Sequence, residues 1–317
     1  MEDNKLLIGV DIGGTSIKMG IFDENGKNLS KWEIVTCKES GAEAVIKSIA
    51  ETIIAELEKF EFSLENVIGV GLGIPGGVLA DGYVEVCINL GWKDLNPAQM
   101  LSKELGGITV KSNNDANVAA LGEMWQGAGK GCSDLVMVTL GTGVGGGIII
   151  NQQILNGVYG IAGEIGHTYV SDKIKENCNC GSKGCLEQIA SATGIVRVAK
   201  EMLDSSDKTS VLRNTSNITA KKVLDAAKEN DELSVEIFDF VAGHLARVLY
   251  NISLVINPEV FVIGGGVSNA GEYLTDTIEK KYKEASMLSK HYSKIKLATL
   301  GNDAGIYGAA RLVKKDY

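Results

Sequence analysis

One histidine and three cysteines are spaced as metal ligands would be. The candidate ligands are His167, Cys178, Cys180 and Cys185. Gly181 and Gly184 permit sharp turns between them, and four such ligands on a short polar loop are typical of a closed tetrahedral zinc site. Such a site is structural, because no position on the metal remains for water. The alternative is a loop with free thiols. The other cysteines are too scattered to indicate a disulfide framework.

Two glycine-rich turns between predicted strands could bind phosphate. They are DIGGT at residues 11–15 and LGTGVGGG at residues 140–147, and in both the backbone N–H groups have no Cβ to shield them from an anion. Neither turn contains the lysine of a P-loop. A tight hairpin would need the same glycines for its backbone alone. Lys18 either adds positive charge near a phosphate or is an exposed strand lysine.

Carboxylate and amide side chains are candidates for acid–base chemistry and for binding hydroxyl groups. Asp115 follows Asn113 and Asn114 at the end of a predicted strand. An aspartate there could accept a hydroxyl proton during phosphoryl transfer while an asparagine holds the substrate, or the segment could cap the next helix. Glu164 and Glu187 flank the cysteine loop, where a metal would fix both in a polar wall. Otherwise they are solvated surface charges.

Strand and helix patterns alternate along the chain and predict an α/β fold. Strands are expected at 6–10, 16–23, 67–72 and 108–111, after the turn at 24–27, and from 260 into the glycines 264–266. Helices are expected at about 40–60, at 233–256 and at 305–314. Residues 190–230 show no strong pattern.

The opening pattern recurs near the middle of the chain. The strand, glycine turn and strand of residues 5–26 are matched in order at residues 134–154, and the two turns align at an offset of 128 residues. An offset of this size predicts a duplicated fold with two related lobes. No linker-like stretch separates the halves, so we expect a hinge and a shared cleft.

The composition excludes several classes of protein. The chain has 317 residues, 44% of them hydrophobic, and a net charge of −9, so we expect neither disorder nor binding to nucleic acid or an anionic membrane surface. No secretion signal and no apolar stretch of membrane-spanning length is apparent, which predicts a cytoplasmic protein. The 39 glycines with only 3 prolines indicate close backbone approach rather than a flexible linker.

Taken in order, the motifs resemble those of the ROK family of sugar kinases and repressors, within the superfamily of sugar kinases, actin and Hsp70 ATPases. Within the family they look most like the bacterial ATP-dependent glucokinases. The matching segments are DIGGT (11–15), GIPGGV (73–78), INLGW (88–92), NNDANVAALGE (113–123), LGTGVGGG (140–147), GEIGH (163–167), CNCGSKGCLEQIAS (178–191), GGGV (264–267) and AGIYGAA (304–310).

The resemblance implies a two-lobed actin-like ATPase fold of the ribonuclease H-like type, with a duplicated βββαβα core and a structural zinc loop. The smaller N-terminal lobe would comprise residues 1–117, joined by the C-terminal helix at 303–317. The larger lobe would comprise residues 118–302 and carry the zinc loop at 163–187. The resemblance also implies a homodimer or a larger homo-oligomer.

The implied activity is ATP-dependent phosphorylation of glucose at the 6-hydroxyl, giving glucose 6-phosphate, with Mg²⁺ carried mostly by the nucleotide and Zn²⁺ as a structural ion. Fructose, mannose, N-acetylglucosamine and N-acetylmannosamine remain alternative substrates, and polyphosphate an alternative donor. A further alternative is a sugar-sensing regulator without catalysis. The family's repressors carry a helix-turn-helix domain before the kinase-like part, whereas DIGGT begins here at residue 11, which disfavours that alternative.

The resemblance also assigns roles to individual residues. Asp115 would be the general base for the sugar hydroxyl, and His167 would bind zinc through one ring nitrogen and sugar through the other. The sugar-binding residues would be Gly77, Asn89, Asn114, Asp115, Glu164, His167 and Glu187. The phosphates and Mg²⁺ would be held by Asp11, Gly13, Gly14, Thr15, Lys18, Thr142 and Gly143, and the adenosine by Gly264, Gly265 and Gly266.

Overall fold

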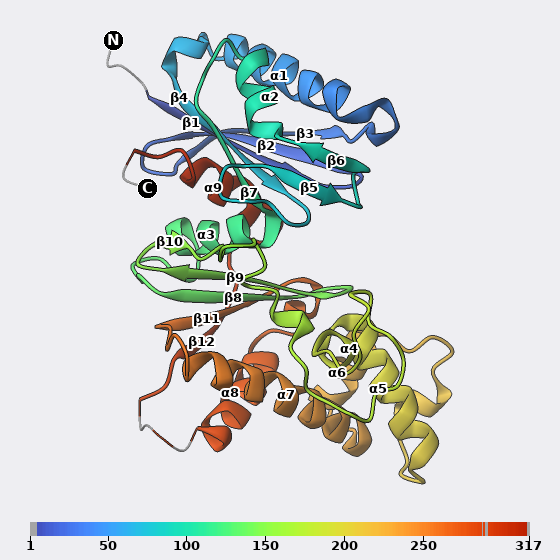
Figure 1. The fold of residues 1–317 in the computed structure, drawn as a ribbon. Helices are drawn as coiled ribbons and strands as arrows, with labels where there is room; N and C mark the ends of the chain where they lie inside the picture. The colour runs from blue at the N-terminus through green and yellow to red at the C-terminus, as the bar shows by residue number, and fades with distance from the viewer. Residues whose placement is uncertain (1–4, 287, 289–290, 316–317) are drawn as a thin grey trace. The chain divides into compact units, whose positions relative to one another are not determined.

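The computed structural model describes residues 5–286, 288 and 291–315, whose strands form two five-stranded sheets and one two-stranded sheet (Figure 1). The chain divides into two compact units. The first comprises Met1–Ser133, Gly147–Gly163 and Thr299–Tyr317, and the second comprises Asp134–Gly146 and Glu164–Ala298. Across the described residues, no helix combines the length and the apolar character needed to cross a membrane.

The first sheet is built from the N-terminal third of the chain. Its strands are β1 Leu6–Ile12, β2 Ser16–Asp23, β3 Asn28–Val35, β4 Val67–Ile74 and β7 Val110–Asn114, in the order β3-β2-β1-β4-β7. β1, β2 and β3 pair antiparallel, whereas β4 runs parallel to both β1 and β7. β1 and β4 are buried over nearly their whole length, as strands covered on both faces must be.

Helices cover both faces of this first sheet (Figure 1). They are α1 Gly41–Lys59, α2 Pro97–Glu104, α3 Asp115–Gln126 and α9 Ala304–Arg311. The apolar face of α1 joins the core on one side of the sheet. On the other side α9 lies directly on the strand backbones: a Cβ on Gly9 would stand 1.8 Å from the carbonyl oxygen of Ile306, and one on Gly71 would stand 1.7 Å from that of Ala309. Glycine is therefore required at both crossings.

The second sheet repeats the strand order of the first. Its strands are β8 Leu135–Leu140, β9 Val144–Ile150, β10 Gln153–Ile154, β11 Val260–Gly264 and β12 Lys294–Leu297, in the order β10-β9-β8-β11-β12. β11 pairs parallel with β8 and β12, and β9 pairs antiparallel with β10. The hairpin strands and the parallel strands thus recur in the same places, which is the predicted duplication.

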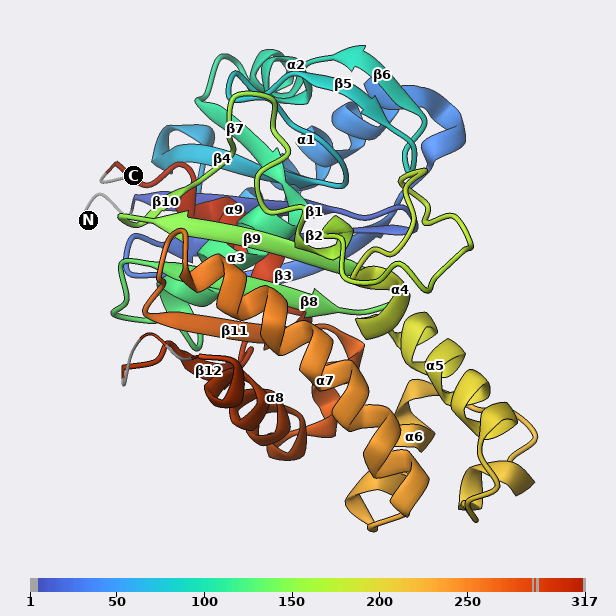
Figure 2. The ribbon, with the colours of Figure 1, turned by 60° about the horizontal axis from the view of Figure 1, so that its bottom comes forward.

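The described helices of the second unit lie in the chain between the metal-ligand segment and β12, four of them before β11 and one after it. They are α4 Glu187–Ala190, α5 Ala192–Ser205, α6 Ala220–Lys228, α7 Glu232–Ser253 and α8 Glu272–Ala285. Figure 2 shows α7 and α8 side by side, and the hydroxyl groups of Ser253 and Tyr282 join them at 2.6 Å. Phe261 of β11 packs against the Tyr282 ring, with centroids 5.8 Å apart, so these helices cover the sheet.

Several elements differ from the sequence-based expectation. The strand expected at 108–111 lies at 110–114, and the helix expected at 233–256 ends at Ser253, before Asn257 with its positive φ of 43°. The hairpin of β5 Val84–Cys87 and β6 Trp92–Leu95 is an addition, as are α2, α5, α6, α8 and β12. The proposed lobe boundaries, 1–117 with 303–317 and 118–302, stay a prediction. α3 packs within the first unit, where a Cβ on Gly122 would stand 2.2 Å from the carbonyl oxygen of Ala304.

Candidate active site

Two carboxylates lie near each other in the first unit. Asp11 is in β1 and Asp115 is the first residue of α3. Burial is the main cause that raises the pKa of Asp11, to about 6, and the negative charge of Asp115 raises it further. Lys18, which faces Asp11 in the β1–β2 register, lowers it. The sequence hypothesis that Lys18 adds positive charge near the first glycine turn is consistent with this position.

The segment before Asp115 is both a helix cap and part of this carboxylate environment. The Asn114 Oδ1 accepts hydrogen bonds from the N–H groups of Ala116 and Asn117, at 2.9 and 3.1 Å, and its Nδ2 donates to the carbonyl oxygen of Gly76 at 2.9 Å. The Asp115 Oδ1 accepts the N–H of Ala116 at 2.8 Å. The cap therefore holds the Asp115 backbone in place, which confirms the helix-cap alternative for this segment, and the role of Asp115 as a base stays a prediction.

The first glycine turn and the 76–89 segment lie beside these residues. The turn closes through the N–H of Gly13, which donates to the carbonyl oxygen of Ser16 at 2.9 Å. A Cβ on Gly14 would stand 3.6 Å from the carbonyl oxygen of Asn89. Thr15, Gly77 and Asn89 are exposed. The first unit thus brings its predicted sugar and phosphate residues into one neighbourhood.

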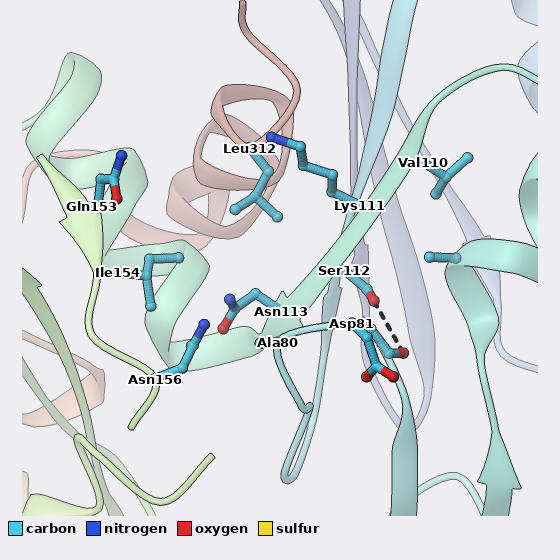
Figure 3. A pocket seen from close by; sticks show the side chains of 12 residues that line it. Ala80, Asp81, Val110, Lys111, Ser112, Asn113, Gln153, Ile154, Asn156 and Leu312 are labelled. Atoms are coloured by element: carbon cyan, nitrogen blue, oxygen red, sulfur yellow. Dashed lines mark hydrogen bonds between the residues drawn. The ribbon is translucent and has the colours of Figure 1, made fainter. Parts of the chain in front are cut away.

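Asn113, next to Asn114 on β7, faces a different environment. Its side chain lines a cavity of about 410 Å³, across from Ile154 and Asn156 (Figure 3). The Asn113 Oδ1 accepts the N–H of Asn114 at 2.8 Å and the Nδ2 of Asn117 at 3.2 Å. The buried Asn113 therefore supports the peptide that precedes Asp115 from the cavity side, a role that the sequence pattern does not reveal.

In the second unit the four predicted metal ligands come together. One ring nitrogen of His167 and the Sγ atoms of Cys178, Cys180 and Cys185 all lie within 4.8 Å of one another. Cys180 Sγ and Cys185 Sγ are 3.7 Å apart, and Cys178 Sγ is 3.6 Å from His167 Nδ1. These separations suit a tetrahedral ion with bonds of about 2.0–2.3 Å. The donor set of three sulfurs and one imidazole therefore fits Zn²⁺.

The imidazole of His167 faces two partners. Its Nδ1 lies toward the sulfur cluster, whereas its Nε2 is 3.8 Å from the Glu164 carboxylate. Both side chains are partly exposed. The ring can therefore give one nitrogen to a metal and keep the other beside a carboxylate that accepts hydroxyl hydrogens.

The second glycine turn is supported by Glu187. The Glu187 Oε2 accepts the N–H of Val144 at 2.9 Å, and a Cβ on Gly143 would stand 2.3 Å from the same oxygen. The other carboxylate oxygen lies 3.7 Å from Cys178 Sγ. Thr142 is exposed at the tip of the turn. Glu187 is thus hydrogen-bonded to the second glycine turn and is not a solvated surface charge.

The glycines after β11 border a second cavity, of about 340 Å³. Gly265, with φ of +81°, passes so close to β8 that a Cβ would stand 2.5 Å from the carbonyl oxygen of Leu140. Gly266 lines the cavity together with Ala192, Thr219, Lys221, Leu224, Val267 and Asn269. The α6 residues of this cavity wall come from residues 190–230, where the sequence shows no strong pattern. The helical spacing of the buried α6 residues is the signal that could have predicted this helix.

Comparison with known proteins decides the family. The model of the ROK family matches residues 7–316. The chain belongs to the ROK family. The family resemblance of the sequence motifs is therefore confirmed, as is the α/β fold with a duplicated core.

Two curated relatives and one solved structure show which ROK proteins this chain is similar to. A glucokinase of Halalkalibacterium halodurans is 42% identical over 97% of this chain and 94% of its own length. A glucokinase of Thermotoga maritima is 38% identical over 98% and 97%, respectively. A ROK family glucokinase of Streptomyces griseus, solved with glucose and AMPPNP, is 34% identical, with a TM-score of 0.74 over 97% of this chain and 98% of that chain.

Proposed function

We propose that this ROK protein is a glucokinase, which transfers the γ-phosphoryl group of ATP to the 6-hydroxyl of glucose and releases glucose 6-phosphate and ADP. The observation that carries the proposal is the Asp11–Asp115 pair beside the first glycine turn. This is the set of groups that phosphoryl transfer to an alcohol requires: a base, a second carboxylate near the phosphates and a turn with backbone donors. The similarity to glucokinases over almost the full chain supports glucose as the acceptor.

In the proposed reaction Asp115 is the general base. Its carboxylate accepts the proton of the 6-hydroxyl while the hydroxyl oxygen attacks the γ-phosphorus and the bond to the β-phosphate oxygen breaks. The capping bonds of Asn114 keep the carboxylate's backbone from moving during this step. The second amide hydrogen of Asn114 is left to donate to a sugar hydroxyl.

Asp11 and the two turns would hold the phosphates of ATP and Mg²⁺. The ion, when bound, offsets the negative charge of the phosphates. A carboxylate oxygen is a ligand that Mg²⁺ prefers, and a cation near Asp11 would relieve the repulsion from Asp115. The backbone N–H groups around Gly13, Gly14 and Thr15 and around Thr142 and Gly143, with Lys18, would bind the phosphate oxygens.

The sugar hydroxyl groups would be bound by Gly77, Asn89, Asn114, Glu164, His167 and Glu187. Carboxylates and amides each direct two hydroxyl groups, so a sugar that lacks one of them leaves a polar group unpaired. Zn²⁺, when bound by His167, Cys178, Cys180 and Cys185, would fix the loop that carries the second-unit members of this set.

The adenosine would lie along Gly264, Gly265 and Gly266. The adjoining cavity of about 340 Å³ has apolar walls from Ala192, Leu224 and Val267 and polar groups from Thr219 and Asn269. Such a lining suits a flat base with a few hydrogen-bonding edges. The homo-oligomeric state and the cytoplasmic location remain predictions.

A coupled assay with ATP across glucose, fructose, mannose, N-acetylglucosamine and N-acetylmannosamine tests the proposal. We expect the highest kcat/KM with glucose, and no comparable rate when polyphosphate replaces ATP. A higher kcat/KM with another hexose would reassign the substrate. If calorimetry detected sugar binding but none of the five sugars were phosphorylated, the proposed kinase function would be wrong and a sugar-sensing regulator would be favoured.

A further inference from the structure

The second glycine turn is held from outside by one short segment of the chain. We call residues 187–193 the clasp, because they make three hydrogen bonds to the turn. The three bonds run from Ala192 N–H to the Gly141 carbonyl at 2.8 Å, from Thr193 Oγ1 to the Thr142 carbonyl at 3.0 Å, and from Val144 N–H to Glu187 Oε2 at 2.9 Å. Gly141, Thr142 and Val144 of the turn therefore each have a partner in the clasp.

The hydroxyl of Thr193 has a defined direction. It lies 3.0 Å from the Ser191 Oγ, and that oxygen accepts the N–H of Gly194 at 2.9 Å as the cap of α5. Because Ser191 can donate its own hydroxyl hydrogen to Thr193, the single hydrogen of Thr193 is directed at the carbonyl of Thr142. The cap of a fourteen-residue helix thus orients the group that holds the tip of the turn.

The clasp is also tied to the cysteine loop. Cys185 stands two residues before Glu187, and its N–H donates to the Gln188 Oε1 at 3.2 Å. The Gln188 Nε2 donates to the carbonyl of Glu176, at the other end of the loop, at 3.1 Å. Arg197 of α5 donates to the carbonyl of Gln188 at 2.7 Å. The clasp and the metal-ligand loop therefore form one hydrogen-bonded body.

A turn of this composition needs such support. Glycine loses more backbone entropy on ordering than any other residue, and only one hydrogen bond closes the turn from within, from Gly141 N–H to the Gly143 carbonyl at 2.9 Å. The N–H groups that would face a phosphate must keep their direction. Hydrogen bonds from outside the turn hold this direction and therefore affect how tightly the turn binds phosphate.

We infer that Thr193 is a positioning residue for the ATP phosphates, and that the clasp couples the metal-ligand loop to the phosphate turn. The inference rests on the proposed kinase function. It gives the cysteine loop a second task besides holding the sugar-binding side chains: it sets the geometry of the nucleotide turn. Thr193 would act through the Thr142 carbonyl, to which its hydroxyl donates a hydrogen bond.

Replacement of the Thr193 hydroxyl by an isosteric methyl group tests the first part. In Thr193→Val we expect the KM for ATP to rise about three- to tenfold, the loss typical of one hydrogen bond, while the KM for glucose stays within twofold. Thr193→Ser keeps the hydroxyl and should remain near the wild-type ATP value. Thr193 is exposed, so neither change threatens the core. An unchanged KM for ATP in Thr193→Val, or equal rises for both substrates, would overturn the inference.

Reciprocal coupling between nucleotide and metal tests the second part. A saturating non-hydrolysable ATP analogue with Mg²⁺ should slow the extraction of zinc by a coloured chelator severalfold in the wild-type protein and less in Thr193→Val. Equal protection in both proteins, no protection, or protein purified without zinc would refute the coupling. A wild-type protein that phosphorylates none of the five sugars would instead refute the proposed function, which separates the two failures.

Discussion

At the start of α3, two side chains hold the backbone that carries Asp115, the proposed base. The Asn114 Oδ1 satisfies two of the unpaired N–H groups of the helix, and the adjoining Asp115 accepts a third bond at Ala116. These bonds lower the freedom of the Asp115 carboxylate before any substrate arrives. We therefore expect changes at Asp115 to affect the chemical step far more than the fold.

Asp115→Asn should remove turnover and keep sugar binding. An asparagine can still accept the Ala116 N–H but cannot take the hydroxyl proton, so we expect kcat to fall by about 10²–10⁴-fold. Calorimetry should give a glucose Kd within about threefold of the wild type. The exposed Asp204 offers a matched control, and Asp204→Asn should keep full activity. Retained turnover in Asp115→Asn would remove this residue from the role of base.

Asp11 should oppose folding at neutral pH. Its folded pKa of about 6 lies above its ordinary value of 3.8, so the native state binds the proton more tightly than the unfolded state, and stability is lost as the pH rises through this window. Asp11→Asn should therefore equal the wild type in free energy of unfolding below about pH 4 and exceed it by roughly 3 kcal/mol at pH 8. Its kinase activity should be lost.

Urea unfolding of both proteins at pH 4 and pH 8, without nucleotide or Mg²⁺, measures this difference. The same comparison with Asp204→Asn corrects for general charge effects. If Asp11→Asn raised the free energy of unfolding equally at both pH values, the charge of Asp11 would not be what destabilises the wild-type fold. In the active protein, kcat/KM should decline as the pH falls through about 6, where Asp11 takes up a proton.

At the level of helices and strands, direct contacts between the backbones of α9 and the first sheet determine how the first unit packs. α9 crosses β1 and β4 at Gly9 and Gly71, where the carbonyl oxygens of the helix occupy the positions that Cβ atoms would need. Such a contact leaves no room for repacking, since backbone and not a side chain blocks the space.

Gly71→Ala should destabilise the protein by at least about 2 kcal/mol, measured by urea unfolding, because its Cβ would overlap the carbonyl of Ala309. Gly243→Ala is the matched control. Gly243 lies inside α7 with no atom within 4 Å of an added Cβ, so alanine there should stabilise by about 0.5–1 kcal/mol. Similar effects at both positions would show that close packing of α9 is not the cause.

The metal-ligand loop should carry about one zinc per chain in protein purified without added metal, as determined by elemental analysis. Cys178→Ser should lower this content strongly, because it removes a buried ligand of the cluster. The exposed Cys37, outside the cluster, serves as a control, and Cys37→Ser should keep the zinc. Native-like activity in protein without zinc would contradict a structural role for the metal.

The helices and strands with a clear apolar periodicity could be predicted from the sequence. The ends of elements that consist of polar residues could not. The strand at 16–23 and the long helix α1 match the apolar pattern. β7 extends to Asn114 because pairing with β4 and burial in the first unit, and not propensity, hold its polar end. The four metal ligands are close in sequence and predictable. The bond between Glu187 and Val144 joins residues 43 positions apart, which no local pattern connects.

On the scale of the whole molecule, the path of the chain makes the first unit depend on its last helix. Residues from 299 onward return to the unit that residues 5–133 begin. There the buried Glu123 carboxylate accepts the N–H groups of Thr299 and Leu300, both at distances of 2.8–3.1 Å. α9 then covers the apolar side chains of Leu7 and Phe22.

A chain that ends at Leu300 should therefore be insoluble or unfolded in its first unit, because Leu7 and Phe22 lose their cover and Glu123 loses much of its support. A chain that ends at residue 315 keeps all of α9 and should retain wild-type activity. Soluble expression and circular dichroism compare the two. A soluble and active shorter chain would show that α9 is dispensable.

The contact of α9 with Gly9 and Gly71 also has a consequence for biosynthesis. The ribosome makes β1 and β4 first, yet the helix that seals them emerges more than two hundred residues later. Throughout that interval the nascent chain presents an open, apolar sheet face, the kind of surface that binds holdase chaperones. The first unit can start folding early but can only finish after translation has all but ended.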